Sequence, residues 1–239
     1  DPWLPVLLDT IESTEKIVVA AIHGTALGGG FETAISCHYR CAVPAAKAGF
    51  PEVKLGLLPG AGGTQRSPRL AGIEAALELM TSGAPISAAR AKDLGLIDEI
   101  VEGDLREAAL RYVRKLLDGK APVRRTSEID APGYGDFDAL RAAVAKRARG
   151  QGAPLAIVDC VEATTTMPFA DGMKLEREKF AGLMQGEQSA ALRHFFFAER
   201  KAAKVEGLAK DTPVRDVNSV GIVGGGTMGG GIAMSFANA

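Results

Sequence analysis

The 239-residue chain has few of the features that mark disulfide-rich, membrane-spanning or nucleic-acid-binding proteins. Its three cysteines, Cys37, Cys41 and Cys160, are too few for a disulfide framework, so we expect a reducing compartment. Because no uninterrupted apolar run reaches about 18 residues, we expect no membrane span. The 28 Lys and Arg residues nearly balance the 29 Asp and Glu residues, so no basic surface predicts nucleic acid as a partner.

The sequence also lacks the ligand spacing of a metal site and the residue order of a nucleophilic triad. Cys37, His38 and Cys41 are close in sequence, but no second ligand pair follows them, so we interpret them as core or half-buried residues of one helix. We therefore expect no bound metal. Hydrophobic residues make up 46% of the chain, which is enough for a substantial core. We therefore look for catalytic residues among the carboxylates and for ligand-binding backbone among the glycines.

The most informative stretch is Gly28-Gly29-Gly30-Phe31-Glu32, which follows the apolar, β-like run 17–22. Glycine lets backbone N–H groups approach a ligand closely, because it has no Cβ. A helix N-terminus adds unpaired N–H donors and a partial positive charge. Gly28 and Gly29 therefore predict a site for a developing oxyanion, and Glu32 lies one helical turn further on.

A second carboxylate, Glu52, opens a stretch rich in glycine and proline at residues 51–64, which we predict to be largely loop. Two carboxylates beside glycine-rich segments suit general acid–base catalysis on a substrate whose oxygen is bound by backbone N–H groups. From the residues alone, plainer interpretations stay open. Glu32 could be a first-turn glutamate favoured by the helix dipole, and Glu52 could be a solvated loop residue.

Hydrophobic periodicity and capping residues predict an α/β chain with many helices. Ser87 and Asp104 are the predicted N-caps of two of them. The predicted helices cover residues 3–14, 29–39, a stretch around 70–80 that is broken near Gly72, 88–94, 104–117, 136–149, 154–166, 171–185, 187–204 and 227–237. The predicted strands cover residues 17–22, 40–43, 96–101 and 217–223.

A second glycine-rich turn lies between the strand predicted at 217–223 and the last predicted helix. Gly224, Gly226 and Gly229 fit the pattern G-x-G-x-x-G, in which a tight turn lets a pyrophosphate lie on the helix N-terminus. Together with Met228 they are the candidate cofactor contacts, although a glycine-rich turn without a cofactor is the alternative. The acidic residue expected about 20 positions later would fall beyond Ala239.

Residues 20–32 and 50–66 together closely resemble the signature of the enoyl-CoA hydratase (crotonase) family, including the separation of the two glutamates. The resemblance implies a spiral of ββα units that lacks its first strands, and an acyl-CoA thioester as the substrate. It also implies that Glu32 and Glu52 hold the water that adds to the double bond. Glu52 would deliver the proton to Cα, and Gly29 would donate one oxyanion-hole N–H to the thioester carbonyl.

The C-terminal part resembles segments of multifunctional β-oxidation enzymes. Residues 217–233 look like the opening of a 3-hydroxyacyl-CoA dehydrogenase NAD domain, and residues 171–204 look like linker helices. The resemblance implies a partial crotonase module at 1–118, a helical linker region at 119–216 and the first strand, turn and helix of a Rossmann domain at 217–239. A longer protein would hydrate trans-2-enoyl-CoA to 3-hydroxyacyl-CoA and then oxidise it with NAD to 3-ketoacyl-CoA.

Two other functions stay open: a Δ3,Δ2-enoyl-CoA isomerase of the same family, and a catalytically inactive CoA-binding module. From the character of its two ends we expect the chain to be a piece of a longer protein, with the second oxyanion donor outside it. The resemblance further implies the cytoplasm in a bacterium or the peroxisome in a eukaryote. An oligomer is one option, since single-module crotonases usually form trimers and dimers of trimers.

Overall fold

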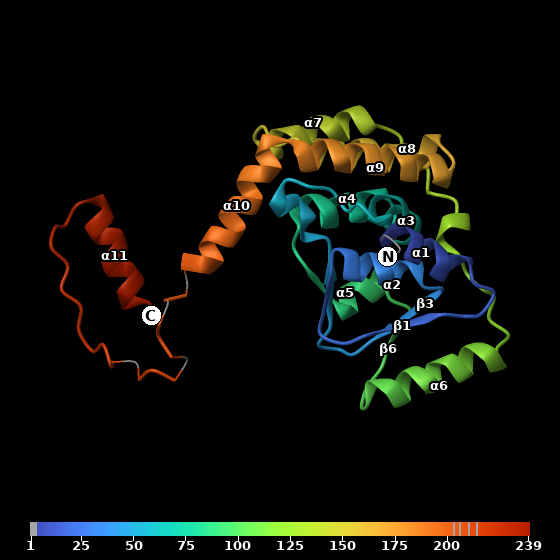
Figure 1. The fold of residues 1–239 in the computed structure, drawn as a ribbon, viewed down its shortest axis with the longest axis horizontal. Coiled ribbons are helices and arrows are strands. Elements are labelled where there is room, and N and C mark those ends of the chain that lie inside the picture. Colours follow the sequence, from blue (N-terminus) through green and yellow to red (C-terminus); the bar gives the residue numbers. More distant parts are fainter. Residues whose placement is uncertain (1–3, 203, 206, 210, 214) are drawn as a thin grey trace. The chain divides into compact units, whose positions relative to one another are not determined.

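The structure, a computed structural model, describes residues 4–239 except residues 203, 206, 210 and 214 (Figure 1). The chain divides into two compact units, the first ending at Glu199 and the second beginning at Arg200. Glu32 and Glu52 belong to the first unit, and the second glycine-rich turn belongs to the second.

The described part of the first unit contains two three-stranded sheets. One has the order β1–β3–β6 and is parallel throughout. The other has the order β2–β4–β5, in which β2 and β4 are parallel and β4 and β5 are antiparallel. The strands are β1 (Val19–Ile22), β2 (Thr25–Leu27), β3 (Tyr39–Ala42), β4 (Lys47–Gly49), β5 (Ile86–Ser87) and β6 (Glu99–Ile100).

The strands and the helices that follow them form successive ββα units. The chain passes from β1 to β2 and into α2 (Gly29–Ser36), and then from β3 to β4 and into the 3-10 helix η1 (Pro51–Leu55). Val19 pairs with Tyr39 in one sheet, and Leu27 pairs with Gly49 in the other. Because corresponding strands of these two ββα units pair in parallel, the ββα unit that begins with β3 stacks on the one that begins with β1. The predicted arrangement of ββα units is confirmed.

Helices pack around the sheets, and three of them, α7, α8 and α9, form a layer along one edge of the first unit. Figure 1 shows α7, α8 and α9 along one edge of the first unit, where α8 packs on α3 and α4, and α9 packs on α3. The remaining helices are α1 (Leu4–Ser13), α3 (Gly63–Ala71), α4 (Ile73–Ser82), α5 (Ala88–Asp93), α6 (Leu105–Asp118), η2 (Thr126–Glu128), α7 (Phe137–Ala148), α8 (Ala153–Thr166), α9 (Phe169–Gln185), α10 (Glu187–Ala202) and α11 (Thr227–Ala237). The end of the helix predicted at 187–204 falls partly on residue 203, which lies outside the described residues.

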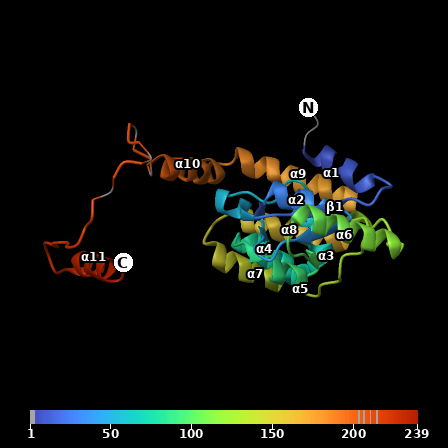
Figure 2. The same cartoon turned by 90° about the horizontal axis from the view of Figure 1, so that it is seen from below.

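The core of the first unit lies between the sheets and these helices. Phe31, Ile35, Leu58, Met80 and Ile157 are fully buried in one cluster that joins α2, α4 and α8. Burying each such side chain contributes roughly 1.5–3 kcal/mol. Helix α9 lies beside α1 (Figure 2). Residues of both helices line a cavity of about 640 Å³. The helices that the sequence assigns to a linker therefore pack on the ββα units.

The predicted helix boundaries follow the capping chemistry. The Ser87 hydroxyl accepts a hydrogen bond from the Arg90 N–H at 3.2 Å, and Asp104 accepts one from the Glu107 N–H at 2.9 Å. Gly72 separates α3 from α4 with a φ of +83°, a conformation that residues with a Cβ rarely adopt. Both predicted caps and the predicted break are confirmed.

The stretch 51–64 is more regular than predicted. Residues 51–55 form η1, and α3 begins at Gly63. Proline suits the first position of a helix, because the missing N–H would have no partner there. Gly56, with a φ of +67°, ends η1. The prediction of a loop was wrong for these turns, because a five-residue helix is too short to show periodicity.

The strand predicted at residues 96–101 is shorter in the structure, where β6 covers only Glu99–Ile100. The N–H groups of Leu96 and Ile97 both donate to the carbonyl of Ala91 at the end of α5, at 2.9 and 3.2 Å. These two residues therefore belong to the turn that follows α5, and their apolar side chains enter the core. The strand was predicted too long because a short apolar run is found both in buried strands and in buried turns.

In the second unit, α11 confirms the helix predicted at residues 227–237. The strand predicted at 217–223 is absent from the described structure. A strand needs a hydrogen-bonded neighbour, and the described residues from 200 onward contain no other strand. Val217 and Val223 are accordingly exposed.

None of the described helices combines the length and apolar character needed to cross a bilayer. Within that same part of the chain, no group of three or more His, Cys, Asp and Glu side chains is placed to hold a metal ion.

Candidate active site

The first glycine-rich turn connects β2 to α2 at the centre of the first unit. Gly28 is the N-cap residue of α2 and has a φ of +55°, which favours glycine. Its N–H donates to the Gly49 carbonyl at 3.0 Å, and its carbonyl accepts from the N–H groups of Phe31 and Glu32, each at 2.8 Å. Gly28 therefore shapes the turn. Because its N–H is engaged, it is not the oxyanion donor that the sequence suggested.

Gly29 is the first residue of α2, so its N–H precedes the intrahelical hydrogen bonds. It is half-buried, and a methyl group built on it would lie 3.1 Å from Leu4 Cδ2 of α1. An N–H at this position points out of the N-terminal end of the helix. This end is the positive end of the helix dipole, which stabilises an anion. Of the two predicted donors, Gly29 is the one with an N–H available for this role.

Glu32 lies one turn into α2 and is 3% exposed. Its Oε1 accepts hydrogen bonds from the N–H groups of Ala61, at 2.7 Å, and Gly63, at 2.9 Å. Among the described residues, no partner is recorded for its second oxygen, Oε2. Burial raises the pKa of Glu32, and the two N–H donors and the charge of Arg66 oppose this increase. One oxygen is thus fixed by the backbone, and the other remains available for a water molecule or substrate.

Glu52 lies in the first turn of η1, beside the Gly28 turn. A methyl group built on Gly28 would overlap Glu52 Oε1, so the carboxyl lies directly against the glycine backbone. Its Oε2 is buried and has no hydrogen-bond partner in the described structure. Burial, and then the negative charge of Glu32, raise the pKa of Glu52 to about 7. The structure therefore brings Glu32 and Glu52 together at one helix N-terminus, with Glu52 able to carry a proton near neutral pH.

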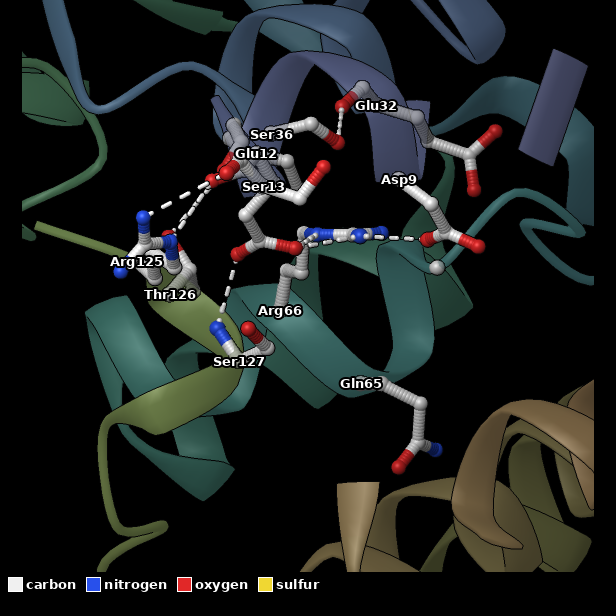
Figure 3. Close-up of polar contacts among 12 residues, drawn as sticks. Asp9, Glu12, Ser13, Glu32, Ser36, Gln65, Arg66, Arg125, Thr126 and Ser127 are labelled. Atoms are coloured by element: carbon white, nitrogen blue, oxygen red, sulfur yellow. Dashed lines mark hydrogen bonds and ion pairs between the residues drawn. The ribbon is translucent and has the colours of Figure 1, made fainter. Parts of the chain in front are cut away.

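A buried ion pair supports the turn that holds Glu32 (Figure 3). The fully buried Arg66 guanidinium donates to Glu12 Oε2 through Nε, at 3.2 Å, and Nη2, at 2.7 Å. A third bond, at 3.2 Å, runs from Nη1 to the Ala61 carbonyl. Glu12 Oε1 in turn accepts from the Ser127 N–H at 2.8 Å. This network links α1 and η2 to the turn that begins at Ala61.

Sequence reasoning missed another buried carboxyl group beside the site, Glu176 of α9, which is 1% exposed. It accepts hydrogen bonds from the N–H groups of Gly62 and Thr64. One signal was present in the sequence: Glu176 follows Gly172 and Met173 by four and three positions and precedes Phe180 by four. That spacing places a lone carboxylate on the helix face that carries small and apolar residues.

In the second unit, the G-x-G-x-x-G turn has the geometry of a tight turn into a helix. Gly224 has a φ of +100°, and Gly226 is the N-cap residue of α11. A methyl group built on Gly229 would overlap the Gly224 carbonyl oxygen, so only glycine fits there. Met228, in the first turn of α11, is 77% exposed.

The comparisons with known proteins agree with the geometry of the first unit. Residues 4–129 match the family described as "Enoyl-CoA hydratase/isomerase". The chain is 47% identical to the peroxisomal bifunctional enzyme of Danio rerio, over 99% of this chain and 34% of that protein. It is 41% identical to the fatty acid oxidation complex subunit alpha of Shewanella halifaxensis, over 95% of this chain and 34% of that protein.

A solved structure has the same fold. A carnitinyl-CoA dehydratase from Mycobacterium avium matches with a TM-score of 0.52 and 29% identity, over 75% of this chain and 60% of that one. The chain spans about a third of the length of the two curated relatives. The family match covers more than half of the chain and includes both Glu32 and Glu52. The resemblance seen in the sequence is confirmed: the chain belongs to the enoyl-CoA hydratase/isomerase family.

Proposed function

We propose that this chain catalyses the hydration of trans-2-enoyl-CoA to 3-hydroxyacyl-CoA, with Glu32 and Glu52 as the catalytic residues. One observation carries the proposal: a buried carboxyl group, Glu32, and a half-buried one, Glu52, lie at the N-terminus of α2 with different partners. Glu32 has one oxygen fixed by two N–H donors, whereas Glu52 has a buried oxygen without a partner and a pKa of about 7. Two carboxyl groups in unlike environments can divide the roles of base and acid.

The reaction can be written with these groups alone. The water oxygen bonds to C3 of the enoyl group, and one water proton passes to Glu32. The π electrons move into the thioester as an enolate, whose oxygen accepts the Gly29 N–H. Glu52 then gives its proton to C2, and exchange through solvent returns the two carboxyl groups to their starting state. Losing one oxyanion donor typically costs about 10²–10³ in rate.

A Δ3,Δ2-enoyl-CoA isomerase is the second candidate, and the description of the matched family includes isomerases. Moving a proton from C2 to C4 of the 3-enoyl group shifts the double bond to C2, and it needs one carboxyl group that both accepts and donates. The raised pKa of Glu52 suits this role as well. A substrate pair distinguishes the candidates, since hydration consumes a 2-enoyl thioester and isomerisation consumes a 3-enoyl thioester.

The test is to incubate the protein with crotonyl-CoA and, separately, with a 3-enoyl-CoA, and to follow the enoyl absorbance and the products by chromatography. The proposal predicts 3-hydroxybutyryl-CoA from crotonyl-CoA. Consumption of the 3-enoyl substrate alone would assign the isomerase. Binding of CoA thioesters without turnover of either substrate would identify an inactive binding module.

We further propose that residues 217–239 begin an NAD-binding module, after a module at 1–118 and a helical region at 119–216. Three observations support it: the positive φ of Gly224, the contact that excludes a side chain at Gly229, and the helix that begins after Gly226. These glycines and Met228 would hold the NAD pyrophosphate at the N-terminus of α11. NAD, when bound, would accept a hydride from the 3-hydroxyacyl product.

This second proposal is tested by NADH binding, measured by fluorescence titration of the full protein. Gly224→Val should weaken NADH binding at least tenfold and leave crotonyl-CoA hydration unchanged. Unchanged NADH affinity in the variant would contradict the assignment.

For the cellular location we propose the peroxisome for a eukaryotic source and the cytoplasm for a bacterial one, supported by the names of the Danio rerio and Shewanella relatives. Fluorescence imaging of a tagged protein would check it.

A further inference from the structure

Glu176 reaches from α9 to the turn that carries the partners of Glu32. Its Oε1 accepts the Gly62 N–H at 2.7 Å. Its Oε2 accepts the Thr64 N–H at 3.1 Å and the Thr64 hydroxyl at 2.5 Å. The two oxygens of one buried carboxylate thus bind alternate residues of a single turn.

The remaining N–H groups of this turn belong to Glu32. Glu32 Oε1 accepts from Ala61 and Gly63, the residues that alternate with the two partners of Glu176. Four consecutive N–H groups, at residues 61–64, are therefore divided between two carboxylates. A displacement of Gly62 or Thr64 would move the donors at Ala61 and Gly63, because the residues are joined by planar peptide bonds.

Helix α9 is packed closely enough to fix the position of Glu176. Gly172, one turn before Glu176, lies against Gln65, so that a methyl group at Gly172 would overlap the Gln65 side-chain oxygen. Gln65 Nε2 donates to the Thr64 hydroxyl at 3.1 Å and to the Cys160 carbonyl of α8 at 2.7 Å. The Thr64 hydroxyl therefore accepts from Gln65 and donates to Glu176, which leaves the turn little freedom.

The two carboxylates also interact through charge. Burial, and then the negative charge of Glu32, raise the pKa of Glu176 to about 8. The N–H and hydroxyl donors of the turn oppose this increase. Three donors of one turn therefore converge on a carboxyl group whose charged form is costly to bury.

We propose that Glu176 is a positioning residue for the hydration reaction: it fixes residues 61–64 so that Ala61 and Gly63 orient the Glu32 carboxylate toward the attacking water. The inference rests on the proposed hydratase function. It assigns to α9, a helix outside the matched segment 4–129, a direct part in the geometry of the active site.

The test compares Glu176→Gln with Glu178→Gln, an exposed glutamate on the same helix that serves as the matched control. An amide side chain presents an NH₂ group to one of the two backbone N–H donors, so the turn loses at least one bond. Glu176→Gln should lower kcat for crotonyl-CoA about 10- to 100-fold, the usual cost of a small misplacement of a catalytic group, with KM changed less than about twofold. Glu178→Gln should match the wild type in both parameters.

Amide hydrogen exchange gives a readout that does not depend on turnover. In Glu176→Gln, exchange at Ala61 and Gly63 should be faster than in the wild type, whereas exchange in α4 should be unchanged. If Glu176→Gln does not fold, Thr64→Val provides a milder change, because it removes only the hydroxyl donor. We expect it to lower kcat about threefold to tenfold.

The outcomes separate the two proposals. A wild-type protein that does not hydrate crotonyl-CoA overturns the hydratase function, and the exchange measurement then decides on its own whether Glu176 fixes the turn. A folded Glu176→Gln variant with kcat within twofold of the wild type overturns the positioning role. Unchanged amide exchange at Ala61 and Gly63 in this variant would also overturn the positioning role. So would a variant whose KM rises while its kcat stays at the wild-type value.

Discussion

The Glu52 carboxyl lies against Gly28, with its Cδ atom 3.3 Å from the position where a Cβ on that glycine would stand. Gly28 also has a φ of +55° and a ψ of −129°, a backbone conformation that an L residue adopts at a cost of about 1–3 kcal/mol. Gly28, the N-cap residue of α2, therefore gives the carboxyl group of Glu52 the space that it occupies. The predicted oxyanion site and the Glu52 carboxyl share one turn of backbone.

Gly28→Ala should therefore reduce both stability and activity. We expect a loss of about 1–3 kcal/mol in the free energy of unfolding from backbone strain, and a displaced Glu52 that lowers hydratase kcat at least about tenfold. Gly30→Ala is the control, because a methyl group there meets open space inside the same helix. It should be neutral or stabilise the fold by up to about 1 kcal/mol. Urea unfolding and crotonyl-CoA kinetics measure both; equal behaviour of the two variants would refute the steric account.

The Arg66–Glu12 pair gives a second prediction. Both side chains are buried, whereas Asp9, which lies 3.5 Å from Arg66 Nη2, is 64% exposed. Glu12→Gln leaves a buried cation without its charged partner and should lower the free energy of unfolding by about 3–5 kcal/mol. Asp9→Asn removes only a solvated charge and should cost about 0–1 kcal/mol. Urea unfolding of both variants checks this, and a Glu12→Gln cost as small as that of Asp9→Asn would show that the buried pair is not needed.

The parts of the site that depend on nearby residues could be predicted from sequence. The β2–α2 turn, Gly28 and Glu32 lie within a few residues of one another, so a glycine run and one helical turn are sufficient to place the carboxylate. Glu52 could be added because a family resemblance linked its segment to that of Glu32. Spacing alone left it as a possible loop residue.

The parts that depend on long-range packing could not be predicted. Glu176 reaches Gly62 across 114 positions of sequence, and no local pattern states which turn a helix will cover. The engaged N–H of Gly28 is a similar case, since its acceptor, Gly49, is set by the pairing of β2 with β4. The strand expected at 217–223 failed for the same reason: a strand is formed by its neighbour as much as by its own residues.

The raised pKa of Glu52 predicts a pH dependence of stability. Its pKa rises from an ordinary value of 4.5 to about 7, so the folded chain binds this proton more tightly than the unfolded chain does. The carboxyl group therefore stabilises the fold fully below about pH 4.5, and this contribution is lost as the pH rises through about 7. Glu52→Gln cannot titrate and keeps its interactions across the range.

The Tm difference between Glu52→Gln and the wild type should accordingly shift in favour of the variant between about pH 5 and about pH 8. We expect a shift of about 5–10 °C, since a pKa shift from 4.5 to about 7 corresponds to roughly 2–3 kcal/mol over this pH range in a chain of this size. Thermal unfolding at a series of pH values, with Glu178→Gln as the control, measures it. A difference that is constant with pH would show that Glu52 has an ordinary pKa in the folded chain.

The central claim is that Glu32 and Glu52 together add water to an enoyl thioester. The measurement that tests it most directly is kcat for crotonyl-CoA hydration by the wild type, Glu32→Gln and Glu52→Gln under identical conditions. The account predicts active wild-type protein and a fall of about 10²–10⁴ in kcat for each variant, since each removes one general acid or base. Near-normal hydration by either folded variant would contradict it.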